Sequence, residues 1–252
     1  MAIARFYCDT DFSVRDAFEL PESVAHHIRV RRLRAGDELT LFDGQGNQAQ
    51  ARLVQASKSG CQAQIEASKA ISLELLGQIT LVQGMASQDK MDWIIEKATE
   101  LGVTRMLVVQ AQRSVVRLSE QRAQRRLAHS QRIIESASEQ CGRNHLMQLL
   151  MPLSLDEAIL QCGDRPMLAC LPNAQTRPLN NETLLEPIRK QRGCTIFIGP
   201  EGGWDPSEEK KLISAGAMGT SLGARILRTE TAGLAAIAAL TALLDWEPPS
   251  HN

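Results

Sequence analysis

Two glycine-rich turns in the last third of the chain carry residues that could bind a small molecule and act on it. The first turn is Gly199–Gly203, which follows the apolar run Thr195–Ile198, and the second is Gly223–Arg228, which follows Ser221-Leu222. In an α/β protein, strands that end in glycine bring backbone amides and carbonyls close to a ligand at the sheet edge. The pair of turns therefore predicts one bound cofactor, held mainly by backbone.

The chain lacks the motifs of several common ligand classes. It contains neither the phosphate loop G-x-x-x-x-G-K-[ST] nor the dinucleotide fingerprint G-x-G-x-x-G. None of its six cysteines forms a C-x-x-C pair, which argues against zinc ribbons and redox motifs. His26 and His27 are adjacent, so on a helix they point to different faces, and no third ligand is spaced nearby. We predict no metal site, and we interpret Cys141 as a packing residue.

Strand-like apolar runs alternate with helical stretches after a boundary near residue 72. The expected strands cover 79–85, 106–109, 167–171 and 195–198. The expected helices cover 90–101, 119–140, 154–162, 206–215 and 229–245. This alternation predicts an α/β fold in which helices cover a buried, mostly parallel sheet.

Local signals mark several of these helices. Ser154 begins a capping box, and Asp205-Pro206 is an N-cap followed by proline at the first helical position. We expect Thr229 to cap the last helix. That helix is rich in alanine and leucine on nearly every side, which predicts that it is buried, in part against a partner subunit. Trp93 is expected to lie in the core.

Residues 1–72 predict a separate, small β-rich unit. Polar and apolar residues alternate over 38–42, 50–54 and 61–65, with glycine turns between these runs. Period-two patterning at such short spacing is typical of a small antiparallel barrel. One helix, over 22–34, is expected to precede the strands.

The overall charge excludes few classes of protein, but the local distribution of charge bears on whether the chain binds nucleic acid. The formal net charge is −1, yet residues 28–34 hold four arginines and residues 113–132 hold six against the single Glu120. Binding to phosphates needs a basic patch at the contact rather than a basic whole. No apolar stretch approaches the length of a membrane span, and no apolar signal core follows Arg5. We expect a cytoplasmic protein without a membrane segment.

Five blocks, in this order along the chain, resemble the SPOUT methyltransferases and specifically the RsmE family, which methylates N3 of a uridine in 16S ribosomal RNA. The blocks are 26–30 with 36–37, 90–103, 138–144, 195–204 and 221–232. The resemblance implies a PUA-like RNA-binding β-barrel over 1–72, followed by a SPOUT domain with a deep trefoil knot over 73–252. It also implies a homodimer that acts on the small (30S) ribosomal subunit, at U1498, with S-adenosyl-L-methionine as cofactor.

The same resemblance carries specific residues. The implied cofactor contacts are Leu171, Pro172, Gly199, Pro200, Glu201, Gly202, Gly203, Leu222, Gly223, Ile226, Leu227 and Arg228. The predicted RNA contacts are Arg5, Arg29, Arg31, Arg32, Lys90, Arg125, Arg132 and Arg143.

Methylation of uridine at N3 needs the loss of the N3 proton, so a base or an anion-stabilising cation would lower the barrier. Arg228 is predicted to stabilise the imide anion, and Glu139 or Glu230 to accept the proton or orient the arginine. Two alternatives stay open: another SPOUT reaction such as ribose 2′-O-methylation, and a non-catalytic RNA-binding assembly factor. A nicotinamide dehydrogenase is disfavoured because its fingerprint is missing.

Overall fold

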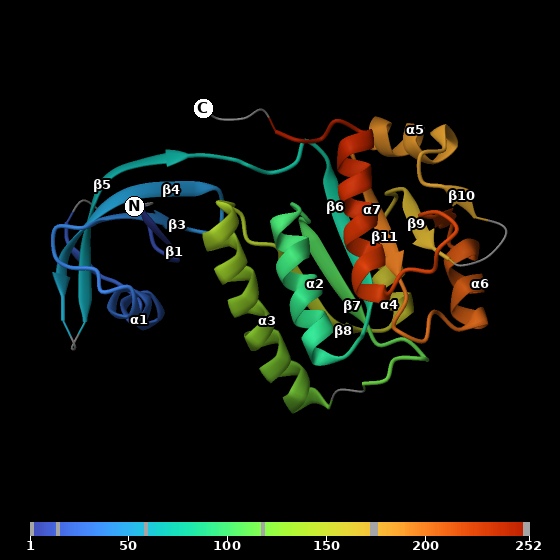
Figure 1. Cartoon of the computed structure of the whole chain (residues 1–252), viewed down its shortest axis with the longest axis horizontal. Helices are drawn as coiled ribbons and strands as arrows, with labels where there is room; N and C mark the ends of the chain where they lie inside the picture. The colour runs from blue at the N-terminus through green and yellow to red at the C-terminus, as the bar shows by residue number, and fades with distance from the viewer. Residues whose placement is uncertain (1–2, 14–15, 58–59, 117–118, 172–175, 249–252) are drawn as a thin grey trace. The chain divides into compact units, whose positions relative to one another are not determined.

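A computed structural model describes residues 3–13, 16–57, 60–116, 119–171 and 176–248 (Figure 1). The chain folds into two compact units. The N-terminal unit comprises residues 1–73 together with 135–146, and the C-terminal unit comprises 74–134 together with 147–252. Among the described residues, no helix combines the length and the hydropathy that crossing a membrane would need.

The N-terminal unit is built on a five-stranded sheet with the order β1-β3-β4-β5-β2. Its elements are β1 (Ala4–Tyr7), β2 (Phe18–Glu19), α1 (Glu22–Val30), β3 (Glu38–Phe42), β4 (Asn47–Ala56) and β5 (Cys61–Ala70). The alternation seen in the sequence places Ala49, Ala51 and Leu53 of β4 in the core. The predicted strand at 38–42 is confirmed, whereas β4 and β5 run further than expected.

Two features of this unit differ from the sequence expectation. The sheet is mixed rather than purely antiparallel, because β1 pairs parallel with β3. Helix α1 ends at Val30 and not at Arg34. Arg32 adopts a positive φ of 58°, and the Leu33 N–H donates to the Ile28 carbonyl. This left-handed residue and its hydrogen bond end the helix, so no further turn follows.

The C-terminal unit contains a seven-stranded sheet with the order β10-β12-β9-β11-β6-β7-β8. Every neighbouring pair in it is parallel, which confirms the predicted α/β fold. The strands are β6 (Gln78–Gly84), β7 (Arg105–Val109), β8 (Gln148–Leu153), β9 (Met167–Cys170), β10 (Arg177–Pro178), β11 (Gly193–Ile198) and β12 (Met218–Ser221). The helices are α2 (Gln88–Glu100), α3 (Glu120–Cys141, shared with the N-terminal unit from Glu135), α4 (Leu155–Leu160), α5 (Glu182–Gln191), α6 (Pro206–Ser214) and α7 (Thr229–Leu243).

Helices α2 and α7 lie side by side, and α7 packs on β6 and β11 in the middle of the sheet (Figure 1). Strands β9, β11 and β12 are well separated in the sequence, yet β9 lies between β11 and β12 in the sheet. Their carboxyl ends therefore meet at one edge, where parallel α/β sheets bind ligands. The trefoil knot implied by the resemblance stays a prediction.

Helix α5 and strands β8 and β12 were not predicted from the sequence, and the prediction that Trp93 lies in the core is wrong. Helix α5 contains Pro187, and β12 contains Gly219, so local propensity argues against both. Trp93 is 53% exposed rather than in the core. The buried stripe of α2 is Met91, Ile94, Ile95 and Ala98, and Trp93 lies outside it, with the Lys97 ammonium 5.1 Å from its ring centre.

Candidate active site

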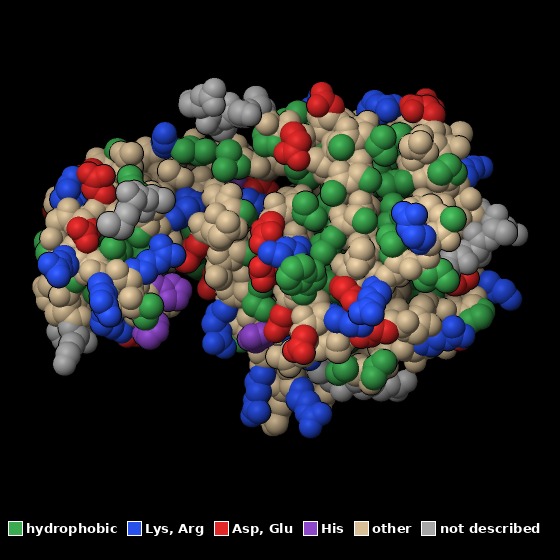
Figure 2. Space-filling model, viewed as in Figure 1, with side chains coloured by type: hydrophobic (Ala, Val, Ile, Leu, Met, Phe, Trp, Pro, Cys, Tyr) green, Lys and Arg blue, Asp and Glu red, His purple; other side chains and the backbone are tan. Residues whose placement is uncertain are grey.

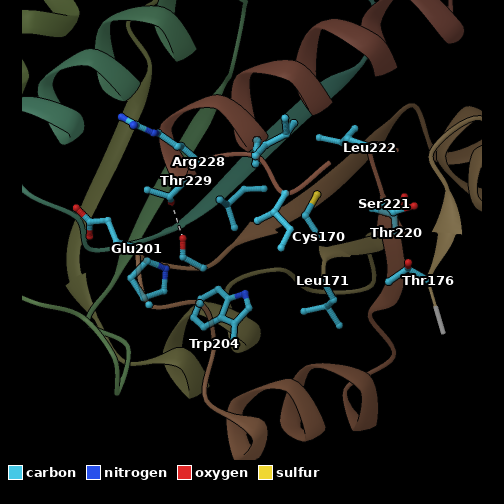
Figure 3. A pocket seen from close by; sticks show the side chains of 18 of the residues that line it. Cys170, Leu171, Thr176, Glu201, Trp204, Thr220, Ser221, Leu222, Arg228 and Thr229 are labelled. Atoms are coloured by element: carbon cyan, nitrogen blue, oxygen red, sulfur yellow. Dashed lines mark hydrogen bonds between the residues drawn. The ribbon is translucent and has the colours of Figure 1, made fainter. Parts of the chain in front are cut away.

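A cavity of about 750 Å³ opens at the carboxyl ends of β9, β11 and β12 (Figure 3). All predicted cofactor residues that the structure describes line this one cavity: Leu171, Gly199, Pro200, Glu201, Gly202, Gly203, Leu222, Gly223, Ile226, Leu227 and Arg228. Pro172 lies outside the described residues. The structure thus brings both glycine turns together, while their contact with a cofactor stays a prediction.

The first turn is compact and held by its own backbone. The Gly203 N–H donates to the Pro200 carbonyl at 2.8 Å, and Gly203 has a φ of +69°, which favours glycine. A Cβ on Gly199 would stand 3.0 Å from the Trp204 nitrogen, so this position admits no side chain without a shift. Trp204 itself is only 3% exposed and anchors the turn in the core.

The second turn is open to solvent, and it leads into α7. Gly223 has a φ of +110°, and the side chains of Ile226 and Arg228 are 88% and 83% exposed. The expectation that Thr229 caps α7 is wrong, because the N-cap residue is Arg228 and no side chain caps it. The Thr229 hydroxyl instead donates to the Gly199 carbonyl at 2.6 Å, which ties the second turn to the first.

Charged side chains from three elements meet at the rim of the cavity. The Lys90 ammonium on α2 lies 3.4 Å from the Glu201 carboxylate and 3.6 Å from that of Glu230 on α7. The Arg228 guanidinium is 4.0 Å from Glu230. Burial alone would raise the pKa of Glu201, but the Ser87 N–H and the Lys90 ammonium outweigh it and lower that pKa below its ordinary value. Glu201 is therefore ionised at neutral pH.

Cys170 also lines the cavity. Burial raises the pKa of its thiol to about 12. The thiol stays protonated at neutral pH and is no nucleophile there.

Three further predicted residues lie in the N-terminal unit and do not line the cavity. The Glu139 carboxylate accepts from the Tyr7 N–H at 3.0 Å, and burial raises its pKa above the ordinary value although Tyr7 and His27 oppose the shift. Arg5 donates to the Arg143 carbonyl and to Asn144. The Arg143 side chain is 4% exposed. Arg5 and Arg143 are thus parts of the fold of this unit.

The other predicted RNA-contacting arginines are reachable from solvent. Arg29 pairs with Glu22 on α1, and the exposed Arg31 and Arg32 end that helix. Arg125 and Arg132 are exposed on α3. Figure 2 shows lysine and arginine side chains projecting near the start of α3, at the bottom of the view.

Sequence reasoning missed several residues that line the cavity: Arg113, Thr176, Trp204, Thr220 and Thr229. Trp204 and Thr229 directly follow predicted positions, so proximity to the motif could have indicated them. Thr220 is the second-last residue of β12, a strand that was not predicted from the sequence, and Arg113 comes from the segment after β7. Only the order of the strands brings these two residues to the same edge.

Comparisons with known proteins agree with this architecture. Residues 73–241 match the family model of an RNA methyltransferase domain, and residues 20–66 match that of an RNA methyltransferase PUA domain. The fold and the site thus define an RNA methyltransferase with an attached PUA domain. The chain is 29% identical to ribosomal RNA small subunit methyltransferase E of Bacillus subtilis, over 87% of each chain. It is 32% identical to the protein of that name from Synechocystis, over 87% of this chain and 71% of the relative.

Solved structures lead to the same family. Ribosomal RNA small subunit methyltransferase E from Neisseria gonorrhoeae, solved with S-adenosyl methionine bound, is 37% identical with a TM-score of 0.85. The superposition covers 96% of this chain and 98% of that one. A methyltransferase from Legionella pneumophila, also in complex with this cofactor, has a TM-score of 0.87 at 26% identity. The chain belongs to the ribosomal RNA small subunit methyltransferase E (RsmE) family.

Proposed function

We propose that this protein is an S-adenosyl-L-methionine-dependent methyltransferase that methylates N3 of a uridine in 16S ribosomal RNA. The observation that carries the proposal is the convergence of both glycine turns on one cavity, in a chain that resembles cofactor-bound RsmE along nearly its whole length.

The lining of the cavity suits the chemistry of the proposed cofactor. Backbone of Gly199–Gly203 and Leu222–Leu227 would hold the adenosyl part, since both turns line the cavity. The ionised Glu201 at the rim would favour a cationic ligand. S-Adenosylmethionine, when bound, supplies a methyl group activated by a positively charged sulfur.

The residues at the rim have the charges that N3 chemistry needs. Arg228, exposed at the mouth of the cavity, would stabilise the imide anion that forms when N3 loses its proton. Glu230 is 17% exposed and lies beside Arg228 and Lys90. We assign proton acceptance to Glu230 rather than to Glu139. Glu230 lies beside Lys90 and Arg228, which line the cavity, whereas Glu139 belongs to the N-terminal unit and its carboxylate is already engaged by Tyr7.

The RNA would be held by basic residues of α1, of the segment directly after it, and of α3. These are the half-buried Arg29, which pairs with Glu22, and the exposed Arg31, Arg32, Arg125 and Arg132, with Lys90 at the cavity rim. Arg5 and Arg143 are left out because their side chains serve the N-terminal unit itself. Such a set of guanidinium groups binds phosphates and positions the RNA without reading its bases. The partner would be the small ribosomal subunit, which places the protein in the cytoplasm.

A second copy of the chain would cover the open side of α7. Along this helix Thr231, Leu234, Ala235, Ala238 and Ala242 are exposed or half-buried at helical spacing, so an almost wholly apolar stripe faces outward. Figure 2 shows hydrophobic side chains on the face over α2 and α7. Small side chains in such a stripe let two helices approach closely, which supports a homodimer.

Methyl transfer from labelled S-adenosylmethionine to small ribosomal subunits that lack the modification tests the proposal. We expect a single labelled nucleoside, N3-methyluridine. A labelled 2′-O-methyl nucleoside would indicate a different reaction of the same fold. Cofactor binding without transfer to these subunits would instead favour a binding role or another RNA.

A further inference from the structure

Gln83 is a buried polar residue that the methyl-transfer chemistry leaves unexplained. It is the second-last residue of β6, in the middle of the parallel sheet, and its side chain is fully buried. Its amide nitrogen donates to the Thr229 hydroxyl at 2.8 Å and to the Gly84 carbonyl at 3.0 Å, and it lies 3.4 Å from the Gly199 carbonyl. Burying a polar side chain costs stability unless its hydrogen bonds are made, so a glutamine here calls for a reason.

The direction of each hydrogen bond in this network is determined by chemistry. The carbonyls of Gly84 and Gly199 can only accept, so the NH2 end of Gln83 must face them. The Thr229 hydroxyl has one proton, which goes to the Gly199 carbonyl at 2.6 Å, and its oxygen accepts from Gln83. Exchanging the two ends of the amide would place its oxygen against two carbonyl oxygens.

This network joins the two segments that line the cavity. Gly199 begins the first turn, and Thr229 follows the second turn as the first residue of α7. The end of β6 also packs tightly against the first turn, since a Cβ on Gly84 would stand 2.4 Å from the Pro200 nitrogen. Figure 3 shows the Thr229 bond as the dashed line below the start of α7.

We propose that Gln83 and Thr229 are positioning residues, which hold the two turns of the cofactor site at the spacing that binding requires. The inference rests on the proposed function, because the ligand whose binding they prepare is S-adenosylmethionine. Neither residue needs to react. Preorganising a site in this way improves affinity because less order has to be created when the ligand binds.

Thr229→Val tests the proposal, because valine keeps the shape of threonine and loses both hydrogen bonds. We expect the dissociation constant for S-adenosylmethionine, measured by calorimetry, to rise about tenfold. At saturating cofactor, turnover should fall by a smaller factor than the affinity does, because the network acts mainly on binding. Thr229→Ser keeps the hydroxyl and should restore the affinity.

Thr241→Val is the matched control. Thr241 lies on the same helix and is 5% exposed, and its hydroxyl has no hydrogen-bond partner among the described residues. Its loss should leave cofactor affinity unchanged. Equal weakening by both valine substitutions, or a Thr229→Val protein that is less stable but binds normally, would overturn the proposal.

Gln83→Met gives an independent measurement, since methionine has a similar size and no donor. If Gln83 and Thr229 act through one network, the double variant should bind more tightly than the two single losses of affinity together predict. Fully additive losses would contradict the shared network. Failure of the unaltered protein to bind S-adenosylmethionine would instead refute the proposed function, so the two failures are distinguishable.

Discussion

At the scale of single residues, exposure separates the side chains that hold the fold from those free to act. The Arg228 side chain is 83% exposed, whereas the adjacent Thr229 is 8% exposed and hydrogen-bonded to the first turn. Substitution of Arg228 should therefore disturb chemistry far more than folding. Substitution of Thr229 should disturb the shape of the site.

Arg228→Ala is expected to lower turnover about a hundredfold, because one stabilising charge at a developing anion is lost. The affinity for S-adenosylmethionine and the melting temperature should change little. Single-turnover kinetics beside calorimetry measures both effects. Arg225→Ala, an exposed arginine of the same turn, serves as control, and equal losses of turnover and cofactor binding in Arg228→Ala would contradict the assigned role.

Glu230→Gln and Glu139→Gln form a matched pair that assigns the proton acceptor. We expect Glu230→Gln to lower turnover by about a hundredfold or more and Glu139→Gln to leave it unchanged. Burial raises the folded-state pKa of Glu139, so its ionised form weakens the fold as pH rises through that pKa. Glu139→Gln should thus be at least as stable as the unaltered protein at pH 7, and any advantage should vanish well below pH 4, where both forms are neutral. The reverse pattern of activities would reassign the base.

At the scale of elements, short local signals determine where the helices beside the cavity begin. Asp205 accepts from the Ser207 N–H, and Glu208 reaches back to the Asp205 N–H, which completes a capping box directly after the first turn. Ser154 and Glu157 form the same motif at α4. Both helix starts could be predicted from sequence because a capping box involves only four consecutive residues.

Asp205→Ala is expected to cost about 1 kcal/mol of unfolding free energy through loss of the cap and also to weaken cofactor binding. Ser154→Ala should cost a similar amount without affecting the cofactor, because α4 does not line the cavity. Urea denaturation and calorimetry on the two variants measure these effects. Weaker binding in both, or in neither, would show that the α6 cap does not position the turn.

At the scale of the whole molecule, an apolar helix face and a set of basic helix residues are the features that a partner would use. Ala238→Glu puts a charge in the outward stripe of α7 and should convert a dimer into a monomer in sedimentation, because an unpaired charge would be buried at the interface. Ala215→Glu, at an exposed alanine on the C-terminal side of α6, should leave the assembly intact. A monomeric unaltered protein would rule out the dimer.

Binding of 16S ribosomal RNA should depend strongly on salt. Arg125→Ala and Arg132→Ala should each weaken the affinity and reduce the slope of log affinity against log salt by about 0.7 to 0.9. Arg189→Ala is the control, because this exposed arginine on α5 is paired with Glu182. Filter binding over a series of salt concentrations measures the slopes, and unchanged slopes would exclude α3 as a phosphate contact.

The sequence by itself determined features that depend on neighbouring residues. These include the two glycine turns, the capping box before α4, the N-cap and proline that begin α6, the alternation of the N-terminal strands and the cluster of arginines over 113–132. Most of the predicted cofactor residues that line the cavity could be named because they stand in two contiguous motifs at strand ends. Strand β12 and helix α5 were missed because Gly219 and Pro187 oppose their local propensity, and packing in the sheet overrides it.

Only the tertiary structure decided which of these features act together. The order β12-β9-β11-β6 brings Thr220, Gly199 and Gln83 to one edge, although they are far apart in the chain. It also places Glu139 in the N-terminal unit and Glu230 beside Lys90 of the C-terminal unit, while which of the two accepts the proton stays a prediction. The physical reason is that strand order and burial arise from long-range packing, which no short stretch of residues encodes.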